Sequence, residues 1–596
     1  MGFDTEVLIV GAGMSGLGFA VQLIRKYNLR GFEIVEKSED VGGTWNVNTY
    51  PGCGCDVASH FYSYSFALNP DWSRKYSHQR EIQAYFRGVA EQYRVLEHIQ
   101  FHSTVEKARW NKEDKIWEVE VLDWKTKQKT VRRAKILVSG VGALSVPKAC
   151  DIPGAETYKG RLFHSAKWDH EFDWGGKDVV VLGNGCSATQ FVPILASPPN
   201  PARTLIQFSR QAQFLSARQN PIYSSTFKAV MRHVPLAMRL YRLKFYIDME
   251  RDYSGFSIES GHTIHQSLAR ENAAYVKNVA PPRYWDALIP TVEVGCKRKV
   301  LDTEYLTTLW RENVELVSDD SVESIVETGV VTRAGREISA DAIVLATGFE
   351  TQQMLVPMEI VGRDGVGLRE YWDQTSRGVA QAYFGTVVPH FPNFFMLMGP
   401  NTVTGHLSVI YSVECQINFI LRLLDPIVKS LPSYRSRSLV PSFFAAAPAT
   451  VEVKAEAAAT DSQWTQKAAK KLVWATGCVN WAVDRKTGLN NSKIFCNEKP
   501  TCFEKGWEAN VCVVMYPDWQ FMFWLRSVFW KKSDFVYVDE ETGKEVNPHV
   551  RKTVLRLVTV AAFASGAFLG RHWIRDELPR RLKDLDTRAL LGSLRA

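Results

Sequence analysis

Residues 42–56, GGTWNVNTYPGCGCD, combine a glycine-rich backbone with side chains that can take part in chemistry. The glycines and the Tyr-Pro turn allow the backbone to bend sharply or to be approached closely by a ligand. The same stretch carries Trp45, two cysteines and Asp56. Taken alone, Asp56 would be interpreted as a loop-capping acid and Trp45 as a core aromatic residue, so their role depends on the elements around them.

A second candidate is the basic dipeptide Lys297-Arg298 in VEVGCKRKVLDTEYL. A guanidinium is permanently charged and can pair with an anion without giving up a proton, although such a dipeptide alone usually lies on a solvated face. Ser15 and Ser187 lie in glycine-rich turns that lack the final glycine of GxSxG, and no HExxH motif is present. We therefore expect neither a serine nucleophile nor a metal site.

The elements that would position these residues begin with an apolar strand, Val7–Val10, that runs into GAGMSG. Gly11 allows the tight turn, Gly13 lets a pyrophosphate approach the backbone, and Gly16 permits close helix packing. A helix-compatible stretch and a second strand follow, and that strand ends at Glu36, where a carboxylate accepts hydrogen bonds from ribose hydroxyls. This βαβ context predicts a dinucleotide site and not an ordinary turn.

A second fingerprint appears in DVVVLGNGCSATQ. The buried strand Val179–Leu182 precedes Gly183, Gly185 and Ala188 in a GxGxxA arrangement that opens another helix. The next strand ends near Arg210 instead of an acid. Because an arginine binds a 2′-phosphate that an acid would repel, the first site suits FAD and the second suits NADPH.

The composition predicts a globular, multidomain protein of the cytoplasm. A chain of 596 residues is too long for one hydrophobic core. The net charge of +8 is spread along the chain without a basic block interleaved with aromatic residues, so we expect no nucleic-acid partner. The ten cysteines include no CxxC pair and residues 1–6 no targeting signal, which indicates a reducing compartment and no disulfide scaffold.

Two dinucleotide fingerprints with this opening loop resemble a class B flavin monooxygenase, and the long loop resembles the first fingerprint of Baeyer-Villiger monooxygenases. The second fingerprint of that family, FxGxxxHxxxW[P/D], is matched by YKGRLFHSAKWD, with Tyr158 in place of phenylalanine. The resemblance covers nearly the whole chain to about Arg526. The matching residues are Gly42, Gly43, Trp45, Tyr50, Pro51, Gly52 and Asp56 in the loop, and Gly160, His164, Trp168 and Asp169 in the second fingerprint.

The resemblance implies an α/β fold with two Rossmann-type dinucleotide-binding domains, the NADPH domain being inserted in the FAD domain. The stretch DAIVLATGFE, Asp341–Glu350, resembles the strand by which such flavoproteins return to the FAD domain. The charged, helical character between Asn220 and Pro290 predicts a small helical insert. We expect an FAD domain in 1–145 and 385–540, an NADPH domain in 146–218 and 292–384, the insert in 219–291, and a C-terminal extension in 541–596.

The resemblance also implies a reaction. NADPH would reduce FAD, O2 would add at the flavin C4a carbon, and the resulting peroxyflavin would convert a small-molecule ketone to an ester or lactone. Asp56 would help orient NADPH beside the flavin, and Trp45 and Tyr62 would pack around the flavin and its phosphates. Arg298 would be the active-site cation that stabilises the developing oxyanion.

Further residues are implied to bind the cofactors or to position the domains. Lys297 would reach the 2′-phosphate of NADPH, and His164 would act on domain positioning more than on chemistry. Cys53 and Cys55 are not expected to be a redox pair, because flavin disulfide reductases use a different spacing. The remaining cofactor contacts that we expect are Gly43, Thr44, Cys55, Val105, Asn184, Cys186, Ser187, Thr189 and Gln211.

Two other functions remain open from the sequence. One is an N- or S-oxygenating monooxygenase on the same fold. The other is an NADPH flavin reductase that passes electrons to a disulfide or a partner protein, against which the missing CxxC argues. Long segments without family motifs are compatible with a role in secondary metabolism or on xenobiotics, and the sequence does not fix the ketone or the oligomeric state.

The C-terminal stretch lies outside the resemblance. Its apolar run, Leu557–Gly570, is flanked by lysines and arginines on both sides and is shorter than the roughly 20 residues needed to span a bilayer. We favour a helix packed on the flavin domain, because the run is apolar on nearly all faces. The alternative is an interfacial anchor that gives peripheral membrane contact through anionic lipid.

Overall fold

The computed structural model describes residues 2–259, 261–296, 298–350, 355–376, 378–435, 448–473 and 515–548. Lys297, predicted to contact a 2′-phosphate, and the apolar run Leu557–Gly570 lie outside these residues. No helix within the described ranges combines the length and the apolar character that crossing a membrane requires.

The larger sheet carries the first fingerprint. In sheet order its strands are β17 (Glu359–Val361), β4 (Ser103–Asn111), β5 (Ile116–Asp123), β6 (Lys129–Ser139), β1 (Thr5–Val10), β2 (Phe32–Val35) and β3 (Ile99–Gln100), with β18 (Phe394–Met396) also paired to β6. β1 pairs in parallel with β2 and β6, whereas β4, β5 and β6 are antiparallel neighbours. Every residue of β1 is buried, as expected for a strand covered on both faces.

The smaller sheet carries the second fingerprint. Its strands, in sheet order, are β12 (Val314–Val317), β9 (Thr204–Phe208), β8 (Asp178–Leu182), β16 (Ala342–Leu345) and β7 (Arg161–His164). All four neighbouring pairs are parallel. The carboxyl ends of these strands therefore meet at one edge, where ligands bind in open α/β sheets.

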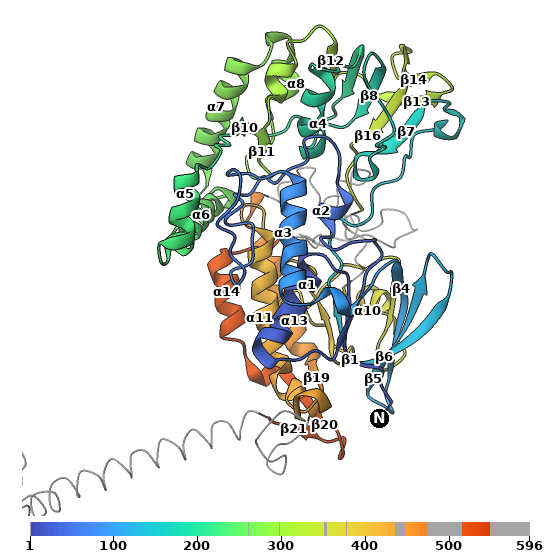
Figure 1. Cartoon of the computed structure of the whole chain (residues 1–596), viewed down its shortest axis with the longest axis vertical. Coiled ribbons are helices and arrows are strands. Elements are labelled where there is room, and N and C mark those ends of the chain that lie inside the picture. The colour runs from blue at the N-terminus through green and yellow to red at the C-terminus, as the bar shows by residue number, and fades with distance from the viewer. Residues whose placement is uncertain are drawn as a thin grey trace, which may run out of the picture.

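Most helices lie to the left of the two sheets, whose strands reach the right side of the molecule (Figure 1). The helices are α1 (Met14–Tyr27), α2 (Thr44–Val47), α3 (Gln79–Gln92), α4 (Cys186–Ala196), α5 (Ser225–His233), α6 (Ala237–Arg251), α7 (His262–Val279), α8 (Trp285–Leu288), α9 (Tyr305–Thr308), α10 (Leu368–Ser376), α11 (Val409–Val428), α12 (Pro432–Arg435), α13 (Ala455–Ala469) and α14 (Gln520–Val528). The expected helical stretch contains α5, α6, α7 and α8. In Figure 1, α5, α6 and α7 stand along the left side of the molecule, and α14 lies below them.

Three small sheets complete the fold. They are β10 (Leu215–Ala217) with β11 (Val300–Asp302), the antiparallel set β13 (Val322–Val326), β14 (Gly329–Thr332) and β15 (Glu337–Ser339), and the antiparallel set β19 (Pro448–Val453), β20 (Phe535–Asp539) and β21 (Glu545–Val546). The β10–β11 pair matters for the site, because it brings the segment after β9 next to the segment that follows Arg298.

Strand pairing refines the expected domain boundaries, which otherwise stay predictions. β16 belongs to the smaller sheet, but β17 pairs with β4 of the larger sheet. The chain has therefore returned to the larger sheet by Glu359, before residue 384, where the second NADPH segment was expected to end.

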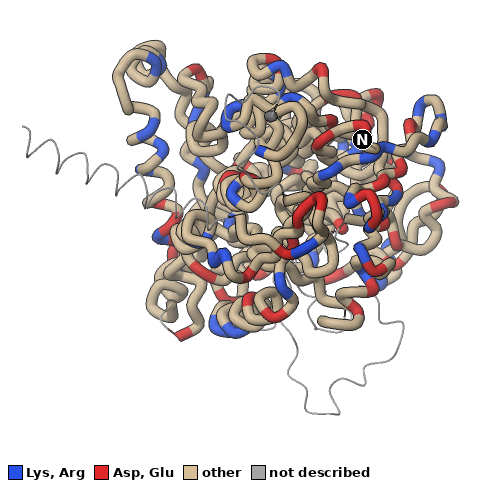
Figure 2. The backbone as a smooth tube through the Cα atoms, turned by 90° about the horizontal axis from the view of Figure 1, so that it is seen from below, with Lys and Arg blue, Asp and Glu red and all other residues tan. Residues whose placement is uncertain are grey.

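Lysines and arginines are interspersed with acids around the surface in Figure 2.

Candidate functional site

The loop of residues 42–56 starts against the first glycine-rich turn. The Gly42 N–H donates to the Ala12 carbonyl at 3.0 Å. Gly43 has a φ of 54° in the left-handed region, and a Cβ added there would lie 3.0 Å from Gly13 Cα. The two backbones thus lie in direct contact, and the positive φ and the short distance at Gly43 favour glycine there.

The other end of the same loop is held by the helix of the second fingerprint. Gln190 Oε1 accepts hydrogen bonds from the Tyr50 hydroxyl at 2.9 Å and the Gly54 N–H at 3.2 Å, and Gln190 Nε2 donates to the Gly54 carbonyl at 3.0 Å. A Cβ on Gly52 would lie 2.8 Å from the Gln190 carbonyl oxygen. The loop therefore bridges the two nucleotide-binding turns.

Gln190 was not among the predicted site residues. The sequence contains a signal for it, because Gln190 follows Cys186 by one helical turn and so shares a face with the start of α4. Its partners lie 136 and 140 residues away in the sequence, which no local pattern reveals.

The structure brings the two predicted catalytic residues together. Arg298 Nε donates to Asp56 Oδ2 at 2.6 Å, and Arg298 Nη2 donates to Asp56 Oδ1 at 3.0 Å. The side chains are 21% and 27% exposed, respectively, so the pair is largely withdrawn from water but still reachable. Burial lowers the pKa of Arg298, but the charge and hydrogen bonds of Asp56 outweigh burial and raise it above its ordinary value. The guanidinium is therefore charged at neutral pH.

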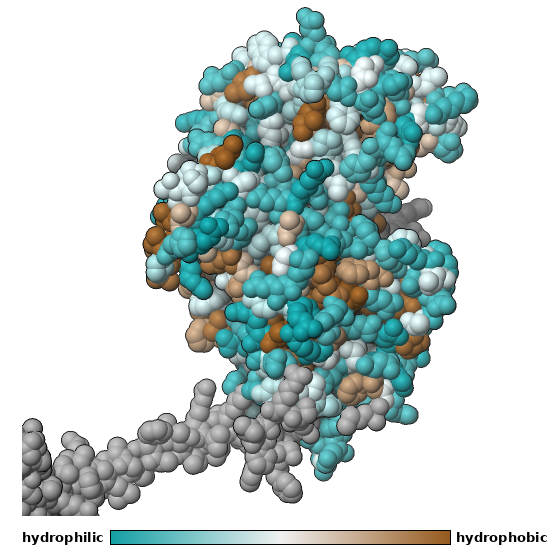
Figure 3. Space-filling model, in the orientation of Figure 1, coloured by the Kyte–Doolittle hydropathy of each residue, from teal (hydrophilic) through white to brown (hydrophobic). Residues whose placement is uncertain are grey.

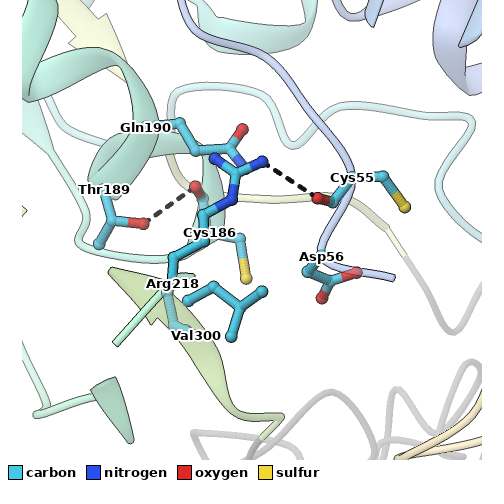
Figure 4. Close-up of a pocket in the computed structure, with 8 residues that line it drawn as sticks. Cys55, Asp56, Cys186, Thr189, Gln190, Arg218 and Val300 are labelled. Carbon is cyan, nitrogen blue, oxygen red and sulfur yellow. Dashed lines mark hydrogen bonds between the residues drawn. The ribbon is translucent and has the colours of Figure 1, made fainter. Parts of the chain in front are cut away.

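A pocket lies beside this ion pair and is shown in Figure 4. Arg218, a second cation that the sequence analysis missed, contributes to its wall and donates from Nη2 to the carbonyls of Cys55 and Tyr76 at 3.4 Å. Burial lowers the pKa of Arg218, and its Nε is buried without a hydrogen-bond partner in the described part of the chain. Arg218 thus holds the backbone immediately before Asp56.

The cysteines around the pocket are protonated at neutral pH. Burial raises the pKa of Cys186 to about 11 and the pKa of Cys53 to about 12, and it raises that of Cys55 further. Raised pKa values disfavour thiolate chemistry, in line with the expectation that Cys53 and Cys55 are not a redox pair. Of the described cysteines, Cys296 is disulfide-bonded, which the sequence pattern did not predict.

Trp45 and Tyr62 form a buried aromatic pair next to the first turn. Trp45 Nε1 donates to the Tyr62 hydroxyl at 3.0 Å, and the ring centroids lie 5.7 Å apart in an edge-to-face arrangement. Trp45 belongs to α2, which begins at Thr44, directly after the turn made by Gly43. Thr44, Trp45 and Tyr62 therefore lie beside the first glycine-rich turn, and their contact with the flavin stays a prediction.

The first glycine-rich turn has the shape of a dinucleotide site. Gly11 has a φ of 97°, and a Cβ on Gly16 would lie 1.9 Å from the Gly11 carbonyl oxygen. Glu36, one residue after β2, accepts the Ala12 N–H at 2.6 Å through Oε2. Val105 is buried in β4, two residues after Ser103, whose N–H donates to the Glu36 carbonyl at 2.8 Å.

The second turn also fits a pyrophosphate. Gly183 has a φ of 116°, whereas a Cβ on Gly185 would meet no atom within 4 Å. That open space is where the fingerprint requires a phosphate to approach the backbone. α4 begins directly after Gly185, so the N–H groups of its first turn are available to an anion. The residues of this first turn are Cys186, Ser187, Ala188 and Thr189.

The end of β9 lies against this turn. Asn184 Nδ2 donates to the Gln211 carbonyl at 2.8 Å, which fixes the segment that carries Arg210 next to the glycine-rich turn. Arg210 is exposed, as a residue that binds a 2′-phosphate from solvent should be. Asn184, Arg210 and Gln211 therefore lie together, as expected for an NADPH site.

His164 occupies the end of β7 and is buried. Its Nδ1 accepts the Ala166 N–H at 3.0 Å, and its ring lies 5.8 Å from that of Phe349, which follows β16. Burial lowers the pKa of His164, so the ring is neutral at pH 7. His164 thus lies among segments that leave the smaller sheet, and its role in domain positioning stays a prediction.

Two glycine-rich turns, each between a parallel strand and a helix, are joined by one loop beside the pocket, and this arrangement is typical of a protein with two dinucleotide sites. A family model described as FMO-like, flavin-binding monooxygenase-like, matches residues 4–220. A Baeyer-Villiger monooxygenase of Pseudomonas aeruginosa is 34% identical over 487 residues, covering 81% of this chain and 86% of that protein. An FAD-binding monooxygenase of Aspergillus niger is 35% identical over 425 residues, covering 70% and 68%.

Among solved structures, an oxidised steroid monooxygenase bound to NADP superimposes with a TM-score of 0.71 at 25% identity, covering 90% of this chain and 99% of that one. The chain belongs to the Baeyer-Villiger monooxygenase family. It is a flavoprotein monooxygenase that uses FAD and NADPH.

Proposed function

We propose that the protein oxidises a ketone to an ester or lactone, with Arg298 and Asp56 at the reacting centre, FAD on the domain of the larger sheet and NADPH on the domain of the smaller one. The observation that supports the proposal most strongly is the bidentate Asp56–Arg298 pair at the pocket between the two glycine-rich turns. The Arg298 guanidinium of this pair stays charged, and in the proposal it lies where the two cofactors meet.

The chain's own residues supply binding, orientation and charge. FAD, when bound, accepts hydride from NADPH and activates O2. The Asp56 carboxylate accepts hydrogen bonds from Nε and Nη2 of Arg298. The other N–H groups of the guanidinium stay available to the carbonyl oxygen of a substrate. Because Arg298 cannot release a proton, it stabilises negative charge on that oxygen without neutralising it.

This charge favours ketone oxidation over the alternatives. Oxygen transfer to a neutral nitrogen or sulfur builds no negative charge on a substrate oxygen, so a fixed guanidinium offers it little. A disulfide-directed reductase needs a reactive thiol pair, whereas the thiols of Cys53 and Cys55 have raised pKa values.

The test is NADPH consumption by the purified enzyme in the presence of a panel of ketones, including secondary-metabolite and xenobiotic ketones, with amines and sulfides as the comparison set. We expect a ketone to stimulate consumption and to yield an ester or lactone that carries one atom of labelled oxygen from 18O2. Oxygenation of amines or sulfides alone, or NADPH oxidation without any oxygenated product, would contradict the proposal.

A further inference from the structure

Helix α6 presents a row of apolar side chains to solvent. Leu236 at its N-cap, Leu240, Leu243 and Ile247 are spaced by four, three and four residues, so they lie on one face of the helix. Their exposed fractions range from 40% to 64%. Single exposed apolar residues are ordinary, but a continuous row along one helix indicates a surface that contacts something else.

The exposed aromatic residues of α14 extend this row. Phe521 and Trp524 are 49% and 40% exposed, and their ring centroids lie 5.7 Å apart. The Phe521 N–H donates to Glu250 Oε1 at 3.0 Å, so α14 begins beside the last turn of α6. We call these residues the α6–α14 surface: Leu236, Leu240, Leu243, Ile247, Phe521 and Trp524. Figure 3 shows brown, apolar side chains at the left edge of the molecule, where Figure 1 places α5, α6 and α14.

Uncompensated cations border the α6–α14 surface. Arg239 and Arg251 on α6 are exposed and form no ion pair with any described residue. α14 contains no acid, and the exposed acid of α6, Asp248, is already paired with Lys244. The border of the apolar row is therefore positively charged.

We propose that the α6–α14 surface docks on a membrane rich in anionic phospholipid. The apolar row would enter the boundary between headgroups and acyl chains, while Arg239 and Arg251 would meet the lipid phosphates. Tryptophan at the rim suits this depth, because its ring is apolar and its N–H is polar.

The same charges disfavour two other occupants. A second copy of the chain, docked by a two-fold axis, would place these cations opposite an identical set. Residues 549–596 contain more basic than acidic residues, so docking that segment here would also bring like charges together. An anionic lipid surface is the occupant whose charge is complementary.

Flotation of the full-length holoenzyme with lipid vesicles tests the proposal. We expect binding to vesicles of equal parts phosphatidylcholine and phosphatidylserine to exceed binding to phosphatidylcholine alone by about tenfold or more. Leu240→Ser/Leu243→Ser/Trp524→Ser should reduce binding to the mixed vesicles at least about tenfold, because apolar burial is lost. Arg239→Gln/Arg251→Gln should reduce it by about fivefold per charge.

The matched control is Val131→Ser, which removes a side chain that is 55% exposed on β6 of the larger sheet and should leave flotation unchanged. Bound flavin and NADPH consumption in solution report that each variant is folded. The proposal is overturned if the wild type does not float, or if the triple variant floats as well as the wild type. It is also overturned if removal of residues 551–596 abolishes flotation while the triple variant still floats. The same holds if the triple variant converts a dimer to a monomer without any loss of vesicle binding, because the surface would then be a subunit interface.

Discussion

Arg298 and Asp56, 242 residues apart in the chain, face each other as a bidentate pair with N···O distances of 2.6 and 3.0 Å. Asp56 ends the loop that touches both glycine-rich turns, and Arg298 lies just before β11. The pair therefore links the loop that contacts both glycine-rich turns to the cation that we propose at the reacting centre.

We expect Asp56→Asn to lower the rate of ketone oxygenation by about tenfold to a thousandfold, the range seen when one electrostatic partner of a reacting centre is removed. The amide cannot accept both donors of Arg298, so the guanidinium loses its fixed orientation. Steady-state product formation measures the loss. Glu315→Gln, which alters an exposed bidentate pair with Arg336 in the smaller sheet, should have no such effect.

Gln190→Leu should destabilise the loop and weaken coenzyme binding. The change leaves the Tyr50 hydroxyl and both backbone groups of Gly54 without their partners, at a cost of about 1–3 kcal/mol. We expect a lower midpoint of thermal unfolding for the holoenzyme and a higher KM for NADPH. Gln266→Leu on the exposed face of α7 is the control, and equal effects of the two changes would contradict a bridging role for Gln190.

Coenzyme choice should depend on Arg210 and Lys297. If both bind the 2′-phosphate, Arg210→Ala/Lys297→Ala should weaken NADPH binding by about 1.5–3 kcal/mol per contact and leave NADH nearly unaffected. Stopped-flow flavin reduction with each coenzyme measures the preference. Equal use of NADH and NADPH by the wild type would rule out this assignment.

His60 should make stability depend on pH. Its ring is buried among Tyr223, Phe227 and Tyr241 without hydrogen-bond partners in the described residues, and burial together with the charge of Arg242 lowers its pKa to about 4. Above about pH 6.5 the ring is neutral in both folded and unfolded states, so it has no effect. Between pH 6.5 and 4, His60 binds a proton in the unfolded chain but stays neutral in the folded protein. The free energy of unfolding therefore falls as the pH falls.

The slope that His60 contributes is up to about 1.4 kcal/mol per pH unit. His60→Phe should remove it, and urea-unfolding midpoints from pH 7 to pH 4.5 would show the difference. His233→Phe, at an exposed histidine of α5, should leave the wild-type pH dependence in place. A His60→Phe protein that loses stability on acidification as steeply as the wild type would contradict the prediction.

The parts of the fold that depend on local chemistry could be predicted from the sequence. The first helix runs to Tyr27 as expected, and the expected strand Val179–Leu182 is β8 with one more residue at its start. Glu36 follows β2 directly. Apolar runs and glycines with a positive φ specify these elements within a few residues. The two nucleotide-binding turns can therefore be predicted from the sequence.

The parts of the site and of the fold that could not be predicted from the sequence depend on contacts between residues that are far apart in the chain. Gln190 and Arg218 reach Gly54 and Cys55 across 136 and 163 residues, and nothing in their own neighbourhoods marks them as partners of the loop. β17 is only three residues long, so its pairing with β4, and with it the boundary between the sheets, could not be read from periodicity.

Single-turnover analysis of Arg298→Ala tests the central claim most directly. Since Arg298 is assigned to the reacting centre and not to FAD binding, the variant should retain bound flavin and normal reduction by NADPH but form no ester or lactone from a ketone that the wild type converts. Consumed O2 should appear as hydrogen peroxide. Conversion of the ketone by Arg298→Ala at a rate near that of the wild type would contradict the account.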